Sequence, residues 1–231
     1  QTLLTRQRYR DRLWIDRHDG EFGHDDPLPI DPWLLGCLLG DGNLSGTGSV
    51  RFSTAAPQIL SLVAERIGAG MAAPHAGKDD CRIGREDRGH VAGLAGSQAN
   101  PLRVALEALA LSGLTSEHKF IPPLYLQAGR ESRLNLLRGL LDTDGWAERW
   151  GSVRLSTSSR RLADDLAALV RSLGGWCSIT TKAPHFTNVA GVRMQGLPAY
   201  VCHVSHPEPR SLFLLSEKQA RAPEAWSRQK R

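Results

Sequence analysis

A repeated nine-residue segment constrains this chain more than any other feature of its sequence. The segments "LLGCLLGDG" (34–42) and "LRGLLDTDG" (137–145) each join an apolar run to an acid and a glycine, and they lie 103 residues apart. At the same offset, "GSVRFST" (48–54) returns as "GSVRLST" (151–157). An amphipathic stretch ending in glycine follows each copy, at 59–68 and at 162–175. The chain is therefore a duplicated unit whose halves are expected to share one fold.

Each half is expected to fold as the same succession of elements. A buried helix comes first, followed by a β-hairpin, the amphipathic helix, two further strands and a closing helix. The further strands are expected at about 70–76 with 81–86, and at about 177–182 with 199–205. The closing helices are expected at about 100–113 and about 209–216. This order predicts an α+β fold with antiparallel sheets.

The hairpin strand of each half has one apolar and one polar face. Val50 and Phe52 share the apolar face, and positions 153 and 155 repeat the pattern. The other face carries arginine and serine, which supply charge for phosphates and bidentate donors for base edges. The solvent-exposed face of any antiparallel sheet could show this pattern in one strand. Its recurrence in both halves favours nucleic-acid binding. The residues predicted to contact DNA are Ser49, Arg51, Ser53, Arg82, Arg85, Ser152, Arg154, Ser156, Lys182 and Arg193.

The acids that end the two apolar helices stand where the helix dipole disfavours them. The C-terminal end of a helix carries the negative pole, so bases are preferred there. Small residues spaced four apart (36 and 40, 139 and 143) would let the helices pack closely and bring Asp41 and Asp144 together. Two carboxylates at convergent helix ends cannot both stay ionised without a cation. A hard divalent ion such as Mg²⁺ is therefore expected between them.

Composition narrows the class of protein. The 231 residues carry a net charge of +5, which modestly favours a polyanionic partner. No apolar run approaches the roughly 20 residues that span a bilayer, and no signal peptide is visible, so we expect no membrane partner and a cytoplasmic location.

The chain starts at Gln1 without a methionine, which suggests excision from something longer. The cysteines lack CxxC spacing and are expected to be reduced: Cys37, Cys81, Cys177 and Cys202.

The paired motifs resemble the LAGLIDADG signature of homing endonucleases in the two-motif, single-chain form. The stretches "IDPWLLGCLLGDG" and "HKFIPPLYL…LLRGLLDTDGW" are most similar to intein-encoded (DOD-type) endonuclease domains, and the resemblance covers residues 28 to about 220. It implies a pseudo-twofold αββαββα fold in which two sheets form a saddle over duplex DNA, with the two motif helices packed at the centre. It also implies double-strand cleavage at a long, asymmetric site with Mg²⁺, for which Mn²⁺ substitutes.

The resemblance also assigns roles by position in the motif. Asp41 and Asp144, the eighth motif residues, are implied to be the catalytic and metal-binding acids. The carbonyls of Gly40 and Thr143, just before them, are implied to be further metal ligands. The sixth position, usually acidic, is Leu39 in the first copy. Because the sixth residue is not the metal ligand in this family, we expect activity to be retained.

Two lysines are candidate catalytic residues. Intein-type members carry a lysine before the "IP" step that precedes the second motif, and Lys119 in "HKFIP" occupies this place. Its partner in the other half is expected to be Lys218, because "SEHK" (116–119) is echoed by "SEK" (216–218). The chain has only five lysines, so the presence of two of them at pseudo-equivalent positions strengthens the prediction that both are catalytic.

The chain is accordingly divided into an N-terminal extension (1–27), two halves (28–127 and 128–216) and a basic C-terminal tail (217–231). It is expected to act as a monomer on double-stranded DNA. It has no splicing nucleophile at position 1 and no terminal His-Asn, so an intein origin implies that the splicing parts are absent here. Two alternatives stay open, a DNA-binding regulator that has lost catalysis and an RNA maturase on the same scaffold.

Two weaker features remain. His203 and His206 beside Cys202 are compatible with zinc, but the segment alternates like a strand and lacks a fourth ligand. Residues 181–193 form a long connection between strands, for which DNA contact and plain disorder are both open.

Overall fold

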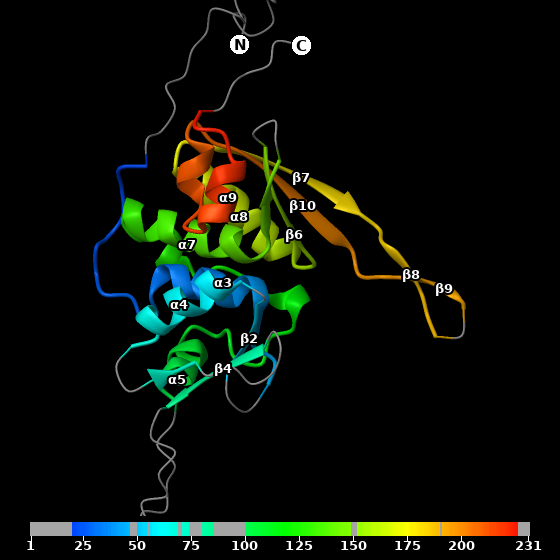
Figure 1. Cartoon of the computed structure of the whole chain (residues 1–231), viewed down its shortest axis with the longest axis horizontal. Helices are drawn as coiled ribbons and strands as arrows, with labels where there is room; N and C mark the ends of the chain where they lie inside the picture. Colours follow the sequence, from blue (N-terminus) through cyan, green and yellow to red (C-terminus); the bar gives the residue numbers. More distant parts are fainter. Residues whose placement is uncertain are drawn as a thin grey trace, which may run out of the picture.

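The described residues between Pro32 and Arg221 form two copies of one αββαββα unit, as the repeat predicts (Figure 1). The computed structural model describes residues 20–46, 50–54, 56–68, 71–73, 80–85, 100–148, 152–189 and 191–225. Each copy folds its four strands into one antiparallel sheet. The α+β class and the duplicated fold are confirmed.

The first half contains α3 (Pro32–Asp41), α4 (Pro57–Arg66) and α5 (Pro101–Ala108). Each of these helices begins with proline, whose missing N–H would have had no partner in the first turn. The sheet order is β1-β2-β4-β3, with bounds Gly42–Asn43, Val50–Ser53, Asp80–Arg85 and Met71–Ala72. In β2 the burial alternates as predicted, since Val50 and Phe52 are buried while Arg51 and Ser53 are exposed.

The second half repeats this plan with α7 (Arg130–Thr143), α8 (Arg160–Ser172) and α9 (Ser216–Arg221). Its sheet order is β5-β6-β10-β7, with bounds Gly145–Ala147, Val153–Thr157, Ala199–Ser205 and Trp176–Lys182. The two sheets also agree in register, because Arg51 lies opposite Arg82 and Arg154 lies opposite His203. The remaining helical turns are η1 (Ser116–His118), α6 (Pro123–Leu126) and η2 (Pro209–Leu212).

The closing element of the second half differs from its expected bounds. The segment expected as a helix at 209–216 is the short 3₁₀ turn η2, and the helix itself, α9, runs from Ser216 to Arg221. Residues 217–221, expected to begin a tail, are therefore helical and carry Lys218 back to the end of α7. Residues 1–19, Ser49 and 226–231 lie outside the described residues.

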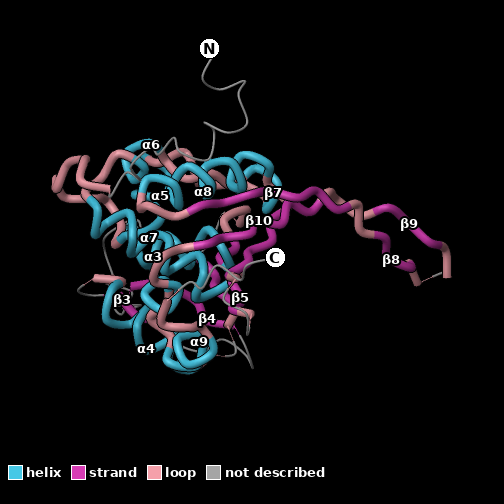
Figure 2. The backbone as a smooth tube through the Cα atoms, turned by 90° about the horizontal axis from the view of Figure 1, so that it is seen from above, coloured by secondary structure: helices cyan, strands magenta, loops and turns pink. Residues whose placement is uncertain are grey.

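A two-stranded ribbon extends β7 and β10 away from the body (Figures 1 and 2). We call residues 183–198 the arm; it contains β8 (His185–Thr187) and β9 (Arg193–Gln195), which pair antiparallel. The connection at 181–193, for which disorder was one reading, is thus mostly strand and turn.

The four cysteines and His206 are buried structural residues. All four cysteines are buried and none is in a disulfide. His206 is buried, with its ring nitrogen Nε2 3.1 Å from the Leu173 carbonyl oxygen. None of the described helices is both long and apolar enough to span a bilayer.

Candidate active site

The two motif helices meet along their glycine faces. A Cβ added at Gly36 would lie 2.8 Å from the Leu140 nitrogen, and one at Gly139 would lie 2.9 Å from the Cys37 nitrogen. Both distances are shorter than real Cβ contacts, so the backbones of α3 and α7 touch where no side chain fits. At Gly40 the added atom would lie 3.1 Å from Thr143 Cβ. The predicted close packing of the helices is confirmed, and it brings their C-terminal ends together.

Asp41 and Asp144 meet at these convergent ends. Their carboxyl groups share a hydrogen bond, and a Cβ at Gly40 would lie 3.4 Å from Asp144 Oδ2. Burial raises the pKa of Asp41. Burial and the nearby charge of Asp41 raise the pKa of Asp144 to about 7, against the lowering effect of Lys119 and Lys218. One proton shared between two carboxyl groups is the state that a like-charge pair adopts when no other cation lies between them.

The pair lies at an opening rather than in a sealed core. Asp144 keeps solvent-exposed surface and Asp41 is half-buried, although the surrounding protein excludes enough water to raise both pKa values. A cavity of about 360 Å³ adjoins the first acid, and its lining includes Asp41, Asn43, Ser45, Thr115 and Lys119. The first acid is therefore open to a small ligand from solvent.

Lys119 caps the end of α3. Its ammonium donates to the carbonyl oxygens of four residues, at 3.3 Å (Leu38), 2.9 Å (Leu39), 2.9 Å (Gly40) and 2.8 Å (Gly42). Because an ammonium has three N–H bonds, these oxygens use its whole donor capacity. The side chain is 4% exposed, and burial lowers the pKa of Lys119 to about 8 while Asp144 and Asp41 raise it.

Lys218 repeats this cap on α7, one for one. It donates to the carbonyl oxygens of residues 103 positions later than those of the first half, at 2.8 Å (Leu141), 2.7 Å (Asp142), 3.0 Å (Thr143) and 2.6 Å (Gly145). Burial lowers its pKa as well. The pseudo-equivalence of the two lysines, expected from "SEHK" and "SEK", is confirmed in the structure, whereas their catalytic role stays a prediction. The C-terminal end of each helix is the negative pole of its dipole, where an acid is unfavourable. A lysine ammonium placed there offsets this unfavourable interaction.

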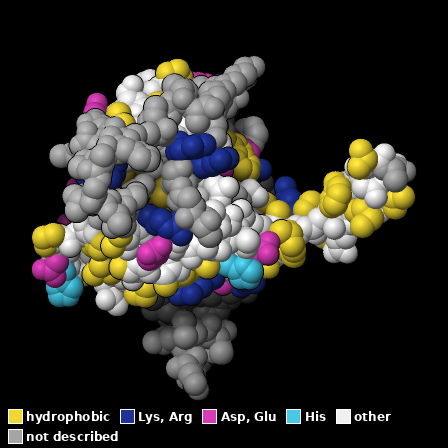
Figure 3. All heavy atoms as spheres, turned by 90° about the horizontal axis from the view of Figure 1, so that it is seen from below, with side chains coloured by type: hydrophobic (Ala, Val, Ile, Leu, Met, Phe, Trp, Pro, Cys, Tyr) yellow, Lys and Arg dark blue, Asp and Glu magenta, His cyan; other side chains and the backbone are white. Residues whose placement is uncertain are grey.

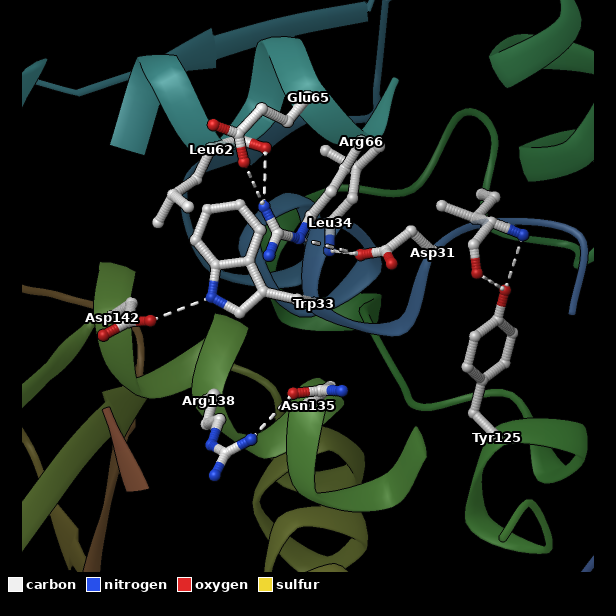
Figure 4. A network of polar contacts seen from close by, with 11 residues as sticks. Asp31, Trp33, Leu34, Leu62, Glu65, Arg66, Tyr125, Asn135, Arg138 and Asp142 are labelled. Carbon is white, nitrogen blue, oxygen red and sulfur yellow. Dashed lines mark hydrogen bonds and ion pairs between the residues drawn. The ribbon is translucent and has the colours of Figure 1, made fainter. Parts of the chain in front are cut away.

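Asp142 holds the second cap in place, a role that the sequence did not suggest. Its buried carboxylate accepts from Trp33 Nε1 at 2.8 Å (Figure 4). It also accepts from the Leu214 backbone N–H at 3.1 Å and from that of Leu215 at 3.2 Å. Burial raises the pKa of Asp142, and these hydrogen bonds lower it. Leu214 and Leu215 lead directly into α9, so Asp142 ties α3 to the helix that carries Lys218. The first copy has Leu39 at this position, whose side chain has no acceptor for such a link.

The donor set fits a hard divalent cation. Two adjoining carboxyl groups with raised pKa values and the carbonyl oxygens of Gly40 and Thr143 are the oxygen ligands that Mg²⁺ and Mn²⁺ take. Both carbonyls already accept from a lysine, so a cation would use their second lone pairs. Within the described ranges no cluster of three or more His, Cys, Asp or Glu side chains is placed for a metal, so two acids would carry the charge of any such site.

The outward faces of both sheets carry matched rows of polar side chains. In the first sheet Asn43, Arg51 and Arg82 lie side by side across three strands. The second sheet has the row Trp146, Arg154, His203 and Ser178. The Nε atoms of Arg82 and Arg154 are buried without a hydrogen-bond partner.

The predicted DNA-contacting residues fall into three groups. Arg51, Ser53, Arg82, Arg154, Ser156 and Lys182 follow the outward alternation of their strands, and Ser152 lies just before β6. Arg154 is also ion-paired with Glu148 at 2.9 Å. Arg85 shares the alternation of Cys81 and Ile83, which face the core, and so lies off this surface. Arg193 lies on the arm.

Sequence reasoning missed Asn43, Trp146 and His203 on these faces. Asn43 and Trp146 stand at the motif offset of 103, each directly after a "DG" pair, so the repeat itself was the signal that could have found them.

Part of the second half matches a known family model. Residues 131–190 match the family model described as a LAGLIDADG-like domain. The chain is similar to the replicative DNA helicase DnaB of Mycobacterium intracellulare, at 31% identity over 158 residues that make up 68% of this chain and 21% of that protein. It is also similar to the ATP-dependent DNA helicase Hel308 of Thermococcus kodakarensis, at 45% identity over 73 residues, 29% of this chain and 6% of that protein. The matched part thus spans about a fifth of the first relative's length, and less of the second's.

Solved structures of the homing endonuclease I-DmoI have a similar arrangement of elements. A structure of its mesophilic variants aligns with a TM-score of 0.46 at 13% identity, covering 80% of this chain and 92% of that chain. Its complex with DNA and Mn aligns with a TM-score of 0.45 at 13% identity, covering 77% of this chain and 89% of that chain.

Proposed function

We propose that this chain is a LAGLIDADG-type homing endonuclease that cuts both strands of duplex DNA at a long, asymmetric site by metal-dependent phosphodiester hydrolysis. The observation that carries the proposal is the pair Asp41 and Asp144, held against each other at the ends of two helices and each backed by a capping lysine. Such a pair costs folding energy, because two adjoining, partly desolvated carboxylates repel when both are ionised. A catalytic role for the two acids would explain why the pair is retained despite this cost.

The chemistry divides between the acids and the lysines. When bound, a divalent cation supplies Lewis-acid activation of water and neutralises charge on the phosphate. Asp41 and Asp144 would hold it, and each acid would serve the strand on its own side of the pseudo-twofold axis. With a pKa of about 7, Asp144 gives up its proton near neutral pH, which frees the second carboxylate for the cation.

Lys119 and Lys218 act electrostatically in this proposal. Their ammonium groups are occupied by backbone carbonyls, so direct donation to water would first require one of those bonds to break. Held where they are, they place a positive charge behind each acid and fix the carbonyls of residues 40 and 143. Both effects favour the build-up of negative charge in the transition state.

The target is bound by the outward sheet faces. The guanidinium groups of the arginines in both rows suit phosphates and guanine edges. One chain with two unlike halves suits an asymmetric site without a second subunit, so we infer a monomer that works inside the cell.

The gene context is proposed to be an intein. The two helicases that the chain resembles are far longer than the matched segment, and they bear different names. This relation is the one expected of a mobile module inserted into larger host proteins. The splicing parts would then lie outside this chain.

The direct test uses the protein, Mg²⁺ and a plasmid that carries the host gene joined across the insertion point. Linear product is expected from this plasmid, and intact circles from one whose gene is already interrupted. A matched pair of substrates of this kind distinguishes site-specific cutting from a contaminating nuclease. Tight binding without cutting would support the regulator, and binding only to the host transcript would support the maturase.

A further inference from the structure

The segment that carries Lys119 is bound by a helix of the opposite half. Lys119 lies at the end of the first half, yet its backbone carbonyl oxygen accepts from Ser159 Oγ of the second half at 2.6 Å. Two residues further on, the Ile121 backbone N–H donates to Asp165 Oδ2 at 3.0 Å. Ser159 is the N-cap of α8, and Asp165 lies within that helix. The second half therefore fixes the backbone from which the first lysine reaches α3.

The equivalent contact in the other direction holds the segment that leads into Lys218. Gln58 of α4, in the first half, accepts from the Ser216 backbone N–H at 3.2 Å and from Ser216 Oγ at 3.1 Å. Its Nε2 donates to the Leu214 carbonyl oxygen at 3.4 Å. Because Ser216 begins α9, these bonds fix the start of the helix that brings Lys218 to α7. The first half thus positions the cap of the second.

The two contacts start from equivalent places in the repeat. Gln58 is the second residue of α4, and Arg161, 103 residues later, is the second residue of α8. Arg161 also contacts the segment that carries the first lysine, because its guanidinium carbon lies 3.8 Å from the centre of the Phe120 ring. The start of each amphipathic helix therefore meets the segment whose lysine caps the motif helix of the other half. This crossing belongs to the duplicated fold and not to a single side chain.

We propose that Asp165 and Gln58 are positioning residues for cleavage, each acting on the lysine of the opposite half. The inference rests on the proposed nuclease function. There, each lysine places a positive charge behind one acid, and such a charge is effective only where it is held in place before the reaction. Ser159 and Asp165 hold the backbone of Lys119, and Gln58 holds the approach to Lys218. The rate on one strand should therefore depend on a helix of the half that serves the other strand.

The two positioning residues are expected to differ in strength. Asp142 accepts from the backbone N–H groups of Leu214 and Leu215, so the second segment keeps this anchor when Gln58 is removed. Asp165 binds a buried N–H, whereas Gln58 is exposed. Loss of Asp165 should therefore have the larger effect.

The test measures the cutting of each strand separately. A duplex that spans the joined host gene carries a different fluorophore on each 5′ end, and denaturing gels follow both products in Mg²⁺. K119M and K218M establish which strand depends on which lysine. D165A should slow the strand that K119M slows, by about two- to tenfold, the range that one lost hydrogen bond supplies. Q58A should slow the opposite strand, by a smaller factor.

A second measurement requires neither metal nor cutting. Acetic anhydride labels lysine amines according to their exposure, and mass spectrometry of the peptides reports each site. In metal-free buffer, D165A should raise the labelling of Lys119 and leave that of Lys218 at the wild-type level. Q58A should do the reverse.

Two control variants accompany both measurements. D165N keeps an oxygen that can accept from the Ile121 N–H, so it should restore wild-type behaviour. Q195A removes an exposed glutamine from the arm, which projects away from the body of the molecule in Figure 3. It should leave the ratio of the two strand rates and the labelling of both lysines unchanged.

Every pattern of results is decisive. Equal slowing of both strands by D165A and by Q58A, or slowing of the same strand by both, overturns the positioning roles and leaves the nuclease standing. Wild-type cutting of both strands by the two variants does the same. A wild-type chain that cuts neither strand overturns the nuclease and this proposal together. Where D165A does not fold, Q58A decides through its strand and its labelling, because Gln58 lies at the surface.

Discussion

At the scale of single residues, the centre of the molecule is a balance of charges at two helix ends. Two acids compete for one proton, and each helix end is neutralised by a lysine that approaches from about 75 to 80 residues away in sequence. The metal-free protein therefore accommodates the two acids by sharing a proton between them, and a bound divalent cation would stabilise both as carboxylates.

We predict that D41N or D144N lowers the rate of double-strand cleavage by at least about 100-fold, because each removes charge that the reaction centre needs. DNA affinity should change little, since the binding surface lies on the sheets. Linear and nicked products, resolved on agarose gels, measure the rate. D164N, which removes an exposed acid from α8, serves as the control, and full cutting by either site variant would refute the assignment.

The raised pKa of Asp144 predicts a stability effect with a definite sign. The folded protein holds this proton up to about pH 7, whereas the unfolded chain loses it near pH 4. Folded protein therefore binds more protons across that window, and stability falls as pH rises through it. In metal-free buffer D144N should melt at a higher temperature than wild type at pH 8, and about equally at pH 4.

The same measurement tests for the cation. At pH 8, Mg²⁺ should raise the melting temperature of the wild-type chain and not that of D144N, because only the former has two carboxylates to share with it. An equal rise in both proteins would show that the ion binds elsewhere.

At the scale of elements, the α3–α7 seam is set by backbone contact. G36A and G139A should each cost about 1–3 kcal/mol in unfolding free energy, since an added methyl group meets backbone that cannot rotate away. Urea unfolding followed by tryptophan fluorescence gives this value. G46A is the control, because nothing lies within 4 Å of the atom that it adds.

The link from Asp142 to α9 gives a second prediction at this scale. D142L installs the residue of the first copy and leaves three donors without an acceptor, the buried ones of Trp33 and Leu215 and the part-buried one of Leu214. We expect a loss of at least about 3 kcal/mol in unfolding free energy. In surviving protein, the loosened Lys218 should slow one strand more than the other, so nicked circles should accumulate. Unchanged stability would mean that α9 is held by other contacts.

Much of this arrangement could be predicted from the repeat, because an element recognised in one half also indicates the equivalent element in the other half. The buried helices, the alternating face of β2 and the pairing of the two lysines all came from matched positions. The carbonyl caps and the role of Asp142 could not, since they depend on segments that meet only after folding. Asp142 breaks the repeat, so comparison with Leu39 gave no guide to its contacts.

The arm was hidden for a local reason. Its strands are three residues each, too short for a clear alternation, and their apolar residues are exposed rather than part of a core. Asn188 and Gly191, which flank the turn, were the residues from which a hairpin could have been predicted.

At the scale of the whole molecule, two sheets present pseudo-equivalent arginines to two halves of one target. R51A should relax base preference in one half-site and R154A in the other, by about 1–3 kcal/mol for a lost arginine–guanine pair. Binding to a library of single-base target variants measures this. Arg154 must also give up Glu148, so its effect should be the smaller. Uniform weakening across the library would mean that both arginines hold phosphates.

The glycine seam has a consequence for how such a chain can evolve. Because α3 and α7 touch through backbone, the spacing of the two acids does not depend on which side chains the sheets display. Substitutions on the outward strand faces can then accumulate without disturbing the reaction centre. A lineage that drifts to a new host gene would inherit the same cut, made in a different sequence.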